Sequence, residues 1–119
     1  MDINKNDEDK LNELSMNILV HAGNARSFMV QGLQIIETEN NYDEAEKLIA
    51  QAHKEIVVAH GLQTETLQKE AMGKSIRYSV LFCHAQDTLM TAQSEVLIAK
   101  HLIKLCESKS IKRKSDVHE

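Results

Sequence analysis

The strongest constraint on the fold is a stretch of sequence whose apolar residues leave no polar face. Residues 80–83 read Val-Leu-Phe-Cys, and residues 96–99 read Val-Leu-Ile-Ala. In a helix, consecutive apolar residues point to every side, and a helix that is hydrophobic all round is buried on all sides. Two partner helices from the same chain cannot cover such a helix. The pattern therefore predicts self-association, with copies of this helix packed around a symmetry axis.

The composition favours helices throughout the chain. The sequence has no proline and four glycines, and it is 42% hydrophobic but only 3% aromatic. A core built from Leu, Ile, Val, Met and Ala favours helix over strand. Apolar residues recur at three- and four-residue steps over 11–36 and 45–67, and a third helix with consecutive apolar residues is predicted over 75–107. The helical patterns break at Asn40-Asn41 and at Gly73. We predict an all-α fold, with a three-helix antiparallel bundle as the protomer.

The predicted helices divide the chain into three parts. These are a flexible N-terminus (1–10), a three-helix domain (11–107) and a polar C-terminal tail (108–119). Asp43, with Glu46 three residues later, resembles a capping box and is the predicted N-cap of the second helix. Gly23 and Gly32 interrupt the first helical pattern. Each marks either a bend or the close approach of a neighbouring helix.

Charge and cysteine usage exclude several classes of function. The net charge is −4 with an isoelectric point near 5.9, which argues against nucleic acid as a partner. The one basic cluster, KSIKRK at 109–114, reads as a solvated tail. Cys83 and Cys106 lie far apart with no C-x-x-C, so no zinc or redox motif is indicated. With no signal peptide and no apolar run that spans a bilayer, we expect a cytoplasmic protein without direct membrane insertion.

An ionisable pair interrupts the most apolar segment. In HAQDT, at 84–88, His84 and Asp87 are three residues apart and therefore neighbours on one helix face. Three readings are open: a hydrogen-bonded specificity device, part of a metal site, or a nucleophilic histidine. No Glu-x-x-His pair and no complete glycine-rich phosphate loop accompany the patch. The spacing alone does not choose between the three.

Three blocks of sequence resemble a known family. HAQDTLMTA at 84–92, HAGNARS at 21–27 and AHGLQTE at 59–65 are similar, in order and spacing, to the enzyme IIA component of the bacterial phosphotransferase system. The class is the one for lactose and cellobiose, and also N,N′-diacetylchitobiose. The resemblance covers residues from about 14 to about 106, on all three predicted helices.

The resemblance implies a fold, an activity and partners. Members of this family are three-helix protomers that assemble as a nine-helix homotrimer. They act through a phosphohistidine intermediate, accept phosphate from the phosphocarrier protein HPr, and pass it to a cognate IIB protein that serves a membrane IIC permease. The phosphohistidine falls on His84. A buried aspartate, shared by three subunits around one divalent cation such as Mg²⁺ at the trimer axis, falls on Asp87.

The sequence departs from the family at one position beside the nucleophile. The family pattern commonly reads H-A-Q-D-H, and here the last position is Thr88, which can hydrogen-bond but carries no positive charge. Gln86 is the other expected supporting residue, as a hydrogen-bonding neighbour of the site. We expect His60 to pack, and His21 to have a core or interface role. Arg26 is expected either to hold phosphate or to form a structural ion pair.

An alternative of another class is a non-enzymatic helical oligomeric adaptor or a regulatory histidine-phosphotransfer module. Such a protein shares a surface histidine and a helical bundle. It does not require a trimer with an axial acidic site, and it does not discriminate in favour of HPr.

Overall fold

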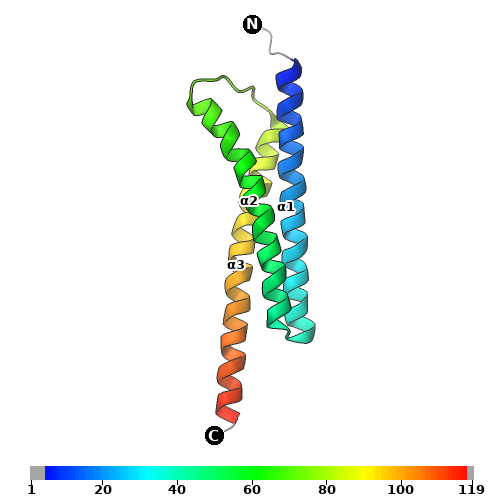
Figure 1. Ribbon diagram of the computed structural model, residues 1–119, viewed down its shortest axis with the longest axis vertical. Helices are drawn as coiled ribbons and strands as arrows, with labels where there is room; N and C mark the ends of the chain where they lie inside the picture. Colours follow the sequence, from blue (N-terminus) through cyan, green and yellow to red (C-terminus); the bar gives the residue numbers. More distant parts are fainter. Residues whose placement is uncertain (1–4, 118–119) are drawn as a thin grey trace.

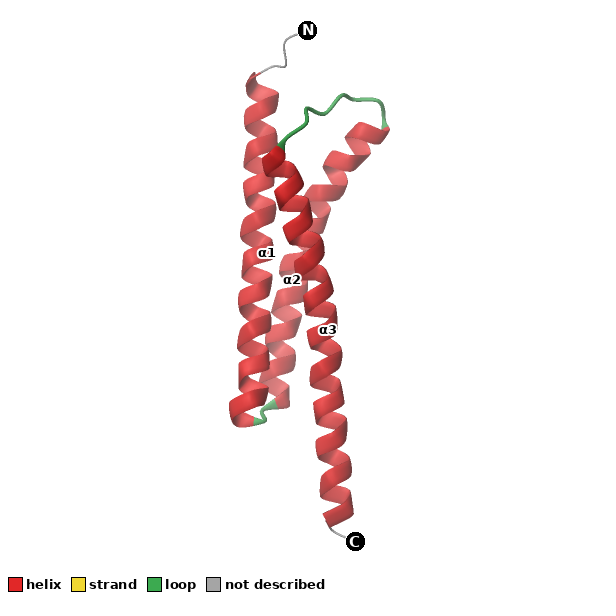
Figure 2. Ribbon diagram, turned by 180° about the vertical axis from the view of Figure 1, so that it is seen from behind, coloured by secondary structure: helices red, strands yellow, loops and turns green. Residues whose placement is uncertain are grey.

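The chain folds into three long helices. The computed structural model describes residues 5–117, and within them the elements are α1 (Lys5–Glu39), α2 (Tyr42–Ala71) and α3 (Val80–Val117), with no strand. The helices run down, up and down, so that neighbours in sequence are antiparallel (Figure 1). Seen from behind, α3 continues past the turn that joins α1 to α2 (Figure 2). The predicted all-α three-helix protomer is confirmed.

The turn between α1 and α2 is built by two asparagines. Asn40 has a φ of 53°, in the left-handed region that asparagine tolerates better than most residues. Asn41 is the N-cap of α2, because its side-chain oxygen accepts a hydrogen bond from the Glu44 N–H at 3.2 Å. The prediction that Asp43 is the N-cap of α2 is therefore wrong. Asp43 lies in the first turn of α2, where its negative charge suits the helix dipole.

Two helices extend beyond their predicted bounds. α1 already begins at Lys5, inside the segment predicted to be a flexible N-terminus, of which residues 1–4 lie outside the described part of the chain. α3 begins at Val80 rather than near Ser75, because the Ser79 hydroxyl accepts a hydrogen bond from the Phe82 N–H at 3.1 Å. It continues to Val117 through the predicted polar tail. No glycine or proline occurs there to stop it.

The core lies between the three helices and is made mostly of small side chains. Its largest fully buried apolar residues are Ile18, Leu89 and Ile103. The remaining positions include alanines from all three helices: Ala22, Ala25, Ala45, Ala52, Ala59, Ala85, Ala92 and Ala99. Alanine lets helix backbones approach closely, which gives a thin bundle, and its high helix propensity supports the long helices.

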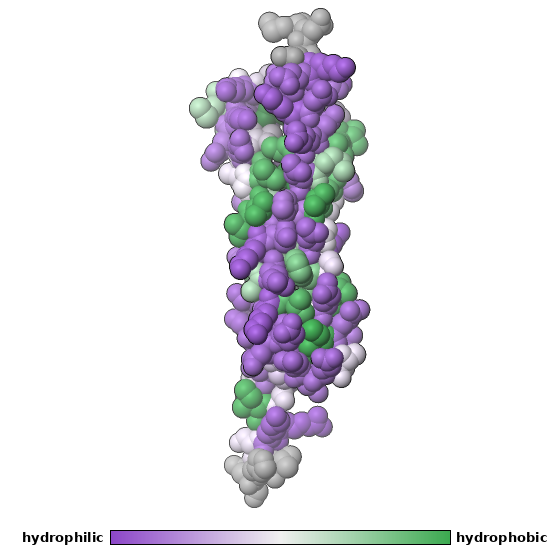
Figure 3. Space-filling model, turned by 45° about the vertical axis from the view of Figure 1, so that its right-hand side comes forward, coloured by the Kyte–Doolittle hydropathy of each residue, from purple (hydrophilic) through white to green (hydrophobic). Residues whose placement is uncertain are grey.

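One face of α3 remains uncovered by its own chain. The core side of this helix is buried, but Met90, Leu97, Ile98, Leu102 and Leu105 are between 43% and 57% exposed. Apolar side chains also reach the surface along the length of the molecule in the space-filling view (Figure 3). The apolar residues of α3 thus form one face that its own chain covers and one face that is exposed. The predicted trimer would bury the exposed face, and it stays a prediction.

The two glycines of α1 have different surroundings. A Cβ built on Gly32 would lie 3.3 Å from the Ala45 carbonyl oxygen and 3.5 Å from the Leu48 Cβ, so α2 approaches closely here. A Cβ on Gly23 would meet nothing within 4 Å. Of the two readings left open by the sequence, close approach holds for Gly32.

The glycines therefore make a matched pair for mutation. We expect Gly23→Ala to raise the free energy of unfolding by up to about 1 kcal/mol, because alanine is the better helix former. Gly32→Ala should gain less or lose stability, because the Ala45 carbonyl must move away from the new methyl group. Urea unfolding followed by circular dichroism measures both. An equal gain at the two positions would contradict the close packing of α1 on α2.

Candidate functional site

His84 stands exposed on the second turn of α3. The neighbouring Ala85 and Leu89 are fully buried and fix that turn against the core. Among the described residues, the His84 side chain forms no hydrogen bond and no ion pair. The result is a free imidazole held on a rigid helix. Such a group is accessible to a protein partner.

Asp87 lies one helical turn after His84 and is also exposed in the single chain. Its carboxylate has no hydrogen-bonding or ion-pairing partner within residues 5–117; only its backbone carbonyl is engaged, accepting a hydrogen bond from the Thr91 hydroxyl at 2.8 Å. Gln86 and Thr88 are half-buried. The structure thus brings all four predicted site residues onto two successive turns of α3, and the role of each stays a prediction.

One chain does not supply a complete metal site. In the part of the chain that the structure describes, no three His, Cys, Asp or Glu side chains gather closely enough to hold a metal ion. The donor that α3 offers at the predicted position is the single Asp87 carboxylate. A carboxylate oxygen is the ligand type that Mg²⁺ prefers, and an ion bound here would take its other ligands from water or from further copies of the chain.

The other histidines and the arginine that the sequence singled out are engaged elsewhere. His21 on α1 pairs with Glu55 on α2, with Nδ1 and Oε2 2.5 Å apart. On α2, His60 is exposed and its Nδ1 lies 3.3 Å from the Thr64 hydroxyl, so the expectation that it packs is wrong for the single chain.

Arg26 forms a structural ion pair. Its Nε and a terminal nitrogen donate to the same Glu95 oxygen at 2.9 and 2.6 Å, which joins α1 to α3. Glu95 follows His84 by eleven residues, or about 16 Å along the helix. Arg26 is thus held too far along α3 to reach a phosphate on His84 of the same chain.

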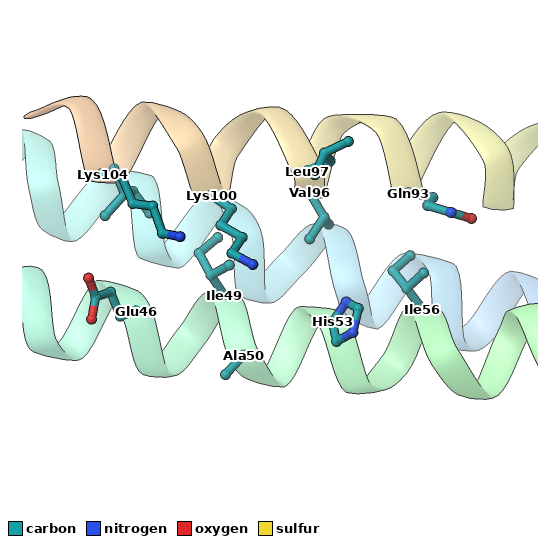
Figure 4. A pocket seen from close by; sticks show the side chains of 11 residues that line it. Glu46, Ile49, Ala50, His53, Ile56, Gln93, Val96, Leu97, Lys100 and Lys104 are labelled. Carbon is teal, nitrogen blue, oxygen red and sulfur yellow. The ribbon is translucent and has the colours of Figure 1, made fainter.

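A groove that the sequence did not predict lies between α2 and α3. It has a volume of about 490 Å³ and an apolar floor that includes Ile49, Ile56 and Val96. Lys100 and Lys104 reach from α3 across it toward α2 (Figure 4). The Gln93 side-chain oxygen, at the end of this groove, is buried and has no hydrogen-bond partner among residues 5–117. The only signal in the sequence is a glutamine within an apolar segment, which does not by itself indicate a groove.

None of the helices in the described range combines the length and the apolar character that crossing a lipid bilayer requires.

Comparison with known proteins shows which family this chain resembles. Residues 13–107 match the sequence profile of the family described as the lactose/cellobiose-specific IIA subunit of the phosphotransferase system (PTS). The chain is 44% identical over 92 residues to the PTS lactose-specific EIIA component of Streptococcus mutans, covering 77% of this chain and 88% of the relative. It is 35% identical over 99 residues to the PTS oligo-β-mannoside-specific EIIA component of Bacillus subtilis, covering 83% and 89%.

A solved structure shows the same fold. The crystal structure of the PTS cellobiose-specific enzyme IIA from Bacillus anthracis superimposes with a TM-score of 0.77 at 35% identity, covering 84% of this chain and 91% of that one. The matched residues include most of α1 and α3, the whole of α2 and the whole HAQDT patch. The chain belongs to the lactose/cellobiose-specific IIA family of the phosphotransferase system.

Proposed function

We propose that this protein is the cytoplasmic phosphoryl relay of a sugar uptake system and that His84 carries the phosphate. The phosphoryl group passes from phospho-HPr to a ring nitrogen of His84, so that the bond from phosphorus to the donor breaks as the bond to the imidazole forms. The group then passes to the cognate IIB protein, which serves the IIC permease. The sugar is a disaccharide of the lactose, cellobiose or chitobiose type.

The observation that carries this proposal is the free and accessible imidazole of His84 on a fixed turn of α3. Phosphoryl transfer depends on positioning and on charge stabilisation more than on covalent machinery. Buried Ala85 and Leu89 supply the positioning, because they hold the helix against the core. Within residues 5–117 no side chain pairs with the His84 imidazole, which leaves both of its ring nitrogens available to a donor protein and an acceptor protein.

The residues beside His84 tune the site. Thr88 lies four residues on, and the i and i+4 side chains of a helix are neighbours. Its half-buried hydroxyl can donate a hydrogen bond to a phosphate oxygen but adds no positive charge. Gln86 is half-buried on an adjacent face and is proposed to support the site by hydrogen bonding. Stabilisation of the phosphorylated imidazole therefore rests on neutral donors in this chain.

The working form is proposed to be a homotrimer. Met90, Leu97, Ile98 and Leu105 on the uncovered face of α3 would bury against the same helix of two other copies. Asp87 lies on this face, so three carboxylates would meet near the axis. Three ionised carboxylates at close range repel one another, and one divalent cation of the Mg²⁺ type would relieve that repulsion. His84, displaced from Asp87 around the helix, would face a groove between subunits.

The site assignment is tested by phosphorylation. Incubation with enzyme I, HPr and phosphoenolpyruvate is expected to add one acid-labile phosphate per chain. We expect His84→Ala to abolish this incorporation, because the accepting nitrogen is gone. The matched control is His53→Ala, which removes an exposed histidine on α2. Incorporation into His84→Ala at the wild-type level would refute the assignment. A wild-type chain that takes no phosphate would favour an adaptor.

The axial cation is tested by returning Mg²⁺ to protein stripped of all metal with EDTA and dialysed. We expect the thermal midpoint of the wild type to rise when Mg²⁺ alone is added, because a ligand that binds only the folded assembly stabilises it. Asp87→Leu should show no such rise, since it lacks the carboxylates that require the cation. Glu13→Gln removes an exposed carboxylate from α1 and should respond to Mg²⁺ as the wild type does. A stripped wild type indifferent to Mg²⁺ would rule out a stabilising Mg²⁺ at Asp87.

A further inference from the structure

A column of polar residues runs down the uncovered face of α3. Counting from Asp87 in steps of seven reaches Ser94, His101 and Ser108, all polar and all exposed in the single chain. A seven-residue step returns to the same seam of a helix that supercoils with its neighbours. If Asp87 faces the axis of an assembly, the other three residues face it as well.

Exposed apolar side chains line both sides of this column. Met90 and Leu97 lie on one side, and Ile98 and Leu105 lie on the other. Apolar residues that keep a heptad spacing over several turns are typical of a seam between helices. In a parallel, rotationally symmetric assembly each residue of the column meets its own copies, so each position of the column becomes a ring. The occupant that fits this face is therefore the same face of further copies of the chain.

We propose that three His101 imidazoles form a second cation site on the axis of the trimer, separate from the Asp87 carboxylates and suited to a zinc-class ion. The inference rests on the homotrimer proposed above. His101 follows Asp87 by fourteen residues, which places the two rings about 21 Å apart along the helix. No single chain contains the site, because each copy contributes one ligand.

The surroundings of His101 suit a metal ligand. Its imidazole forms no hydrogen bond or ion pair with any other described residue, so both ring nitrogens are free. The nearest cations in sequence, Lys100 and Lys104, extend into the groove toward α2 and not along the seam (Figure 4). Ile98 and Leu105, one turn before and one turn after, would form an apolar collar around the ring. Such a collar limits access of water and strengthens binding of the ion.

The two rings differ in the ion that they select. Imidazole nitrogens favour Zn²⁺ and related transition metals, and three histidines with one open position are a known zinc arrangement. Carboxylate oxygens favour Mg²⁺. Zn²⁺ at His101 would join the three helices beyond the phosphorylation site and would stabilise the assembly without taking part in phosphoryl transfer.

The test measures zinc binding and molecular mass on the same untagged, full-length protein in buffer that contains excess Mg²⁺. Equilibrium dialysis should find one tightly bound Zn²⁺ per three chains. We expect His101→Ala and His101→Gln each to weaken this binding at least tenfold, with glutamine keeping a polar group of similar length. His53→Ala removes an exposed histidine from the groove and should bind Zn²⁺ as the wild type does.

Sedimentation of the same samples separates this inference from the assembly on which it rests. Trimers that bind Zn²⁺ equally with and without His101 would overturn the inference and leave the assembly intact. A wild-type mass of one chain would overturn both, while the phosphorylation of His84 is measured independently of either. Loss of Zn²⁺ binding in both His101 variants, at wild-type trimer mass and with His53→Ala unaffected, is the result that supports the site.

Discussion

The structure depends on the two-sided apolar surface of α3. One side is closed by α1 and α2 through a core of alanines and a few large aliphatic residues, and this packing determines which face of the helix is exposed. The opposite side exposes leucine, isoleucine and methionine. Exposed apolar surface of this kind is costly in water, at roughly 25 cal/mol for each Å² that could otherwise be buried. The exposed face of α3 is therefore the surface whose burial against a partner would lower the free energy of the protomer most.

The candidate relay site uses this division of the helix. Buried Ala85 and Leu89 hold one face of the turn against the core, so His84 and Asp87 are presented on the exposed side of the helix. The positive charge of Arg26 is paired with Glu95, and this ion pair joins α1 to α3. In the proposed relay, the helical bundle positions His84, and its unpaired imidazole is the nucleophile. In the proposed trimer, the carboxylate of Asp87 lies among apolar residues because it packs beside the Asp87 carboxylates of the other two copies.

Much of the fold was predictable because helices of this length impose a clear periodicity. The three helices, their order and the turn at Asn40-Asn41 follow from it, whereas the helix ends did not. The N-cap of α2 depends on which polar side chain reaches a free N–H, and Asn41 does so rather than Asp43. The end of α3 depends on the absence of a strong stop signal between 108 and 117. For the site, the sequence alone indicated a polar patch at 84–88, and only the family resemblance suggested that His84 carries phosphate. The pairing of Arg26 with Glu95, sixty-nine positions away, and the groove beside Gln93 depend on tertiary packing and had no local signal.

We propose that the exposed face of α3 is an interface with two further copies of the chain. The most direct measurement is the mass of the unmodified protein by sedimentation equilibrium at micromolar concentration. If the interface forms, the protein is a single species of three times 13.5 kDa. A species of 13.5 kDa across the whole concentration range would contradict it. The apolar face of α3 would then remain in water, and neither Asp87 nor His101 would meet its copies.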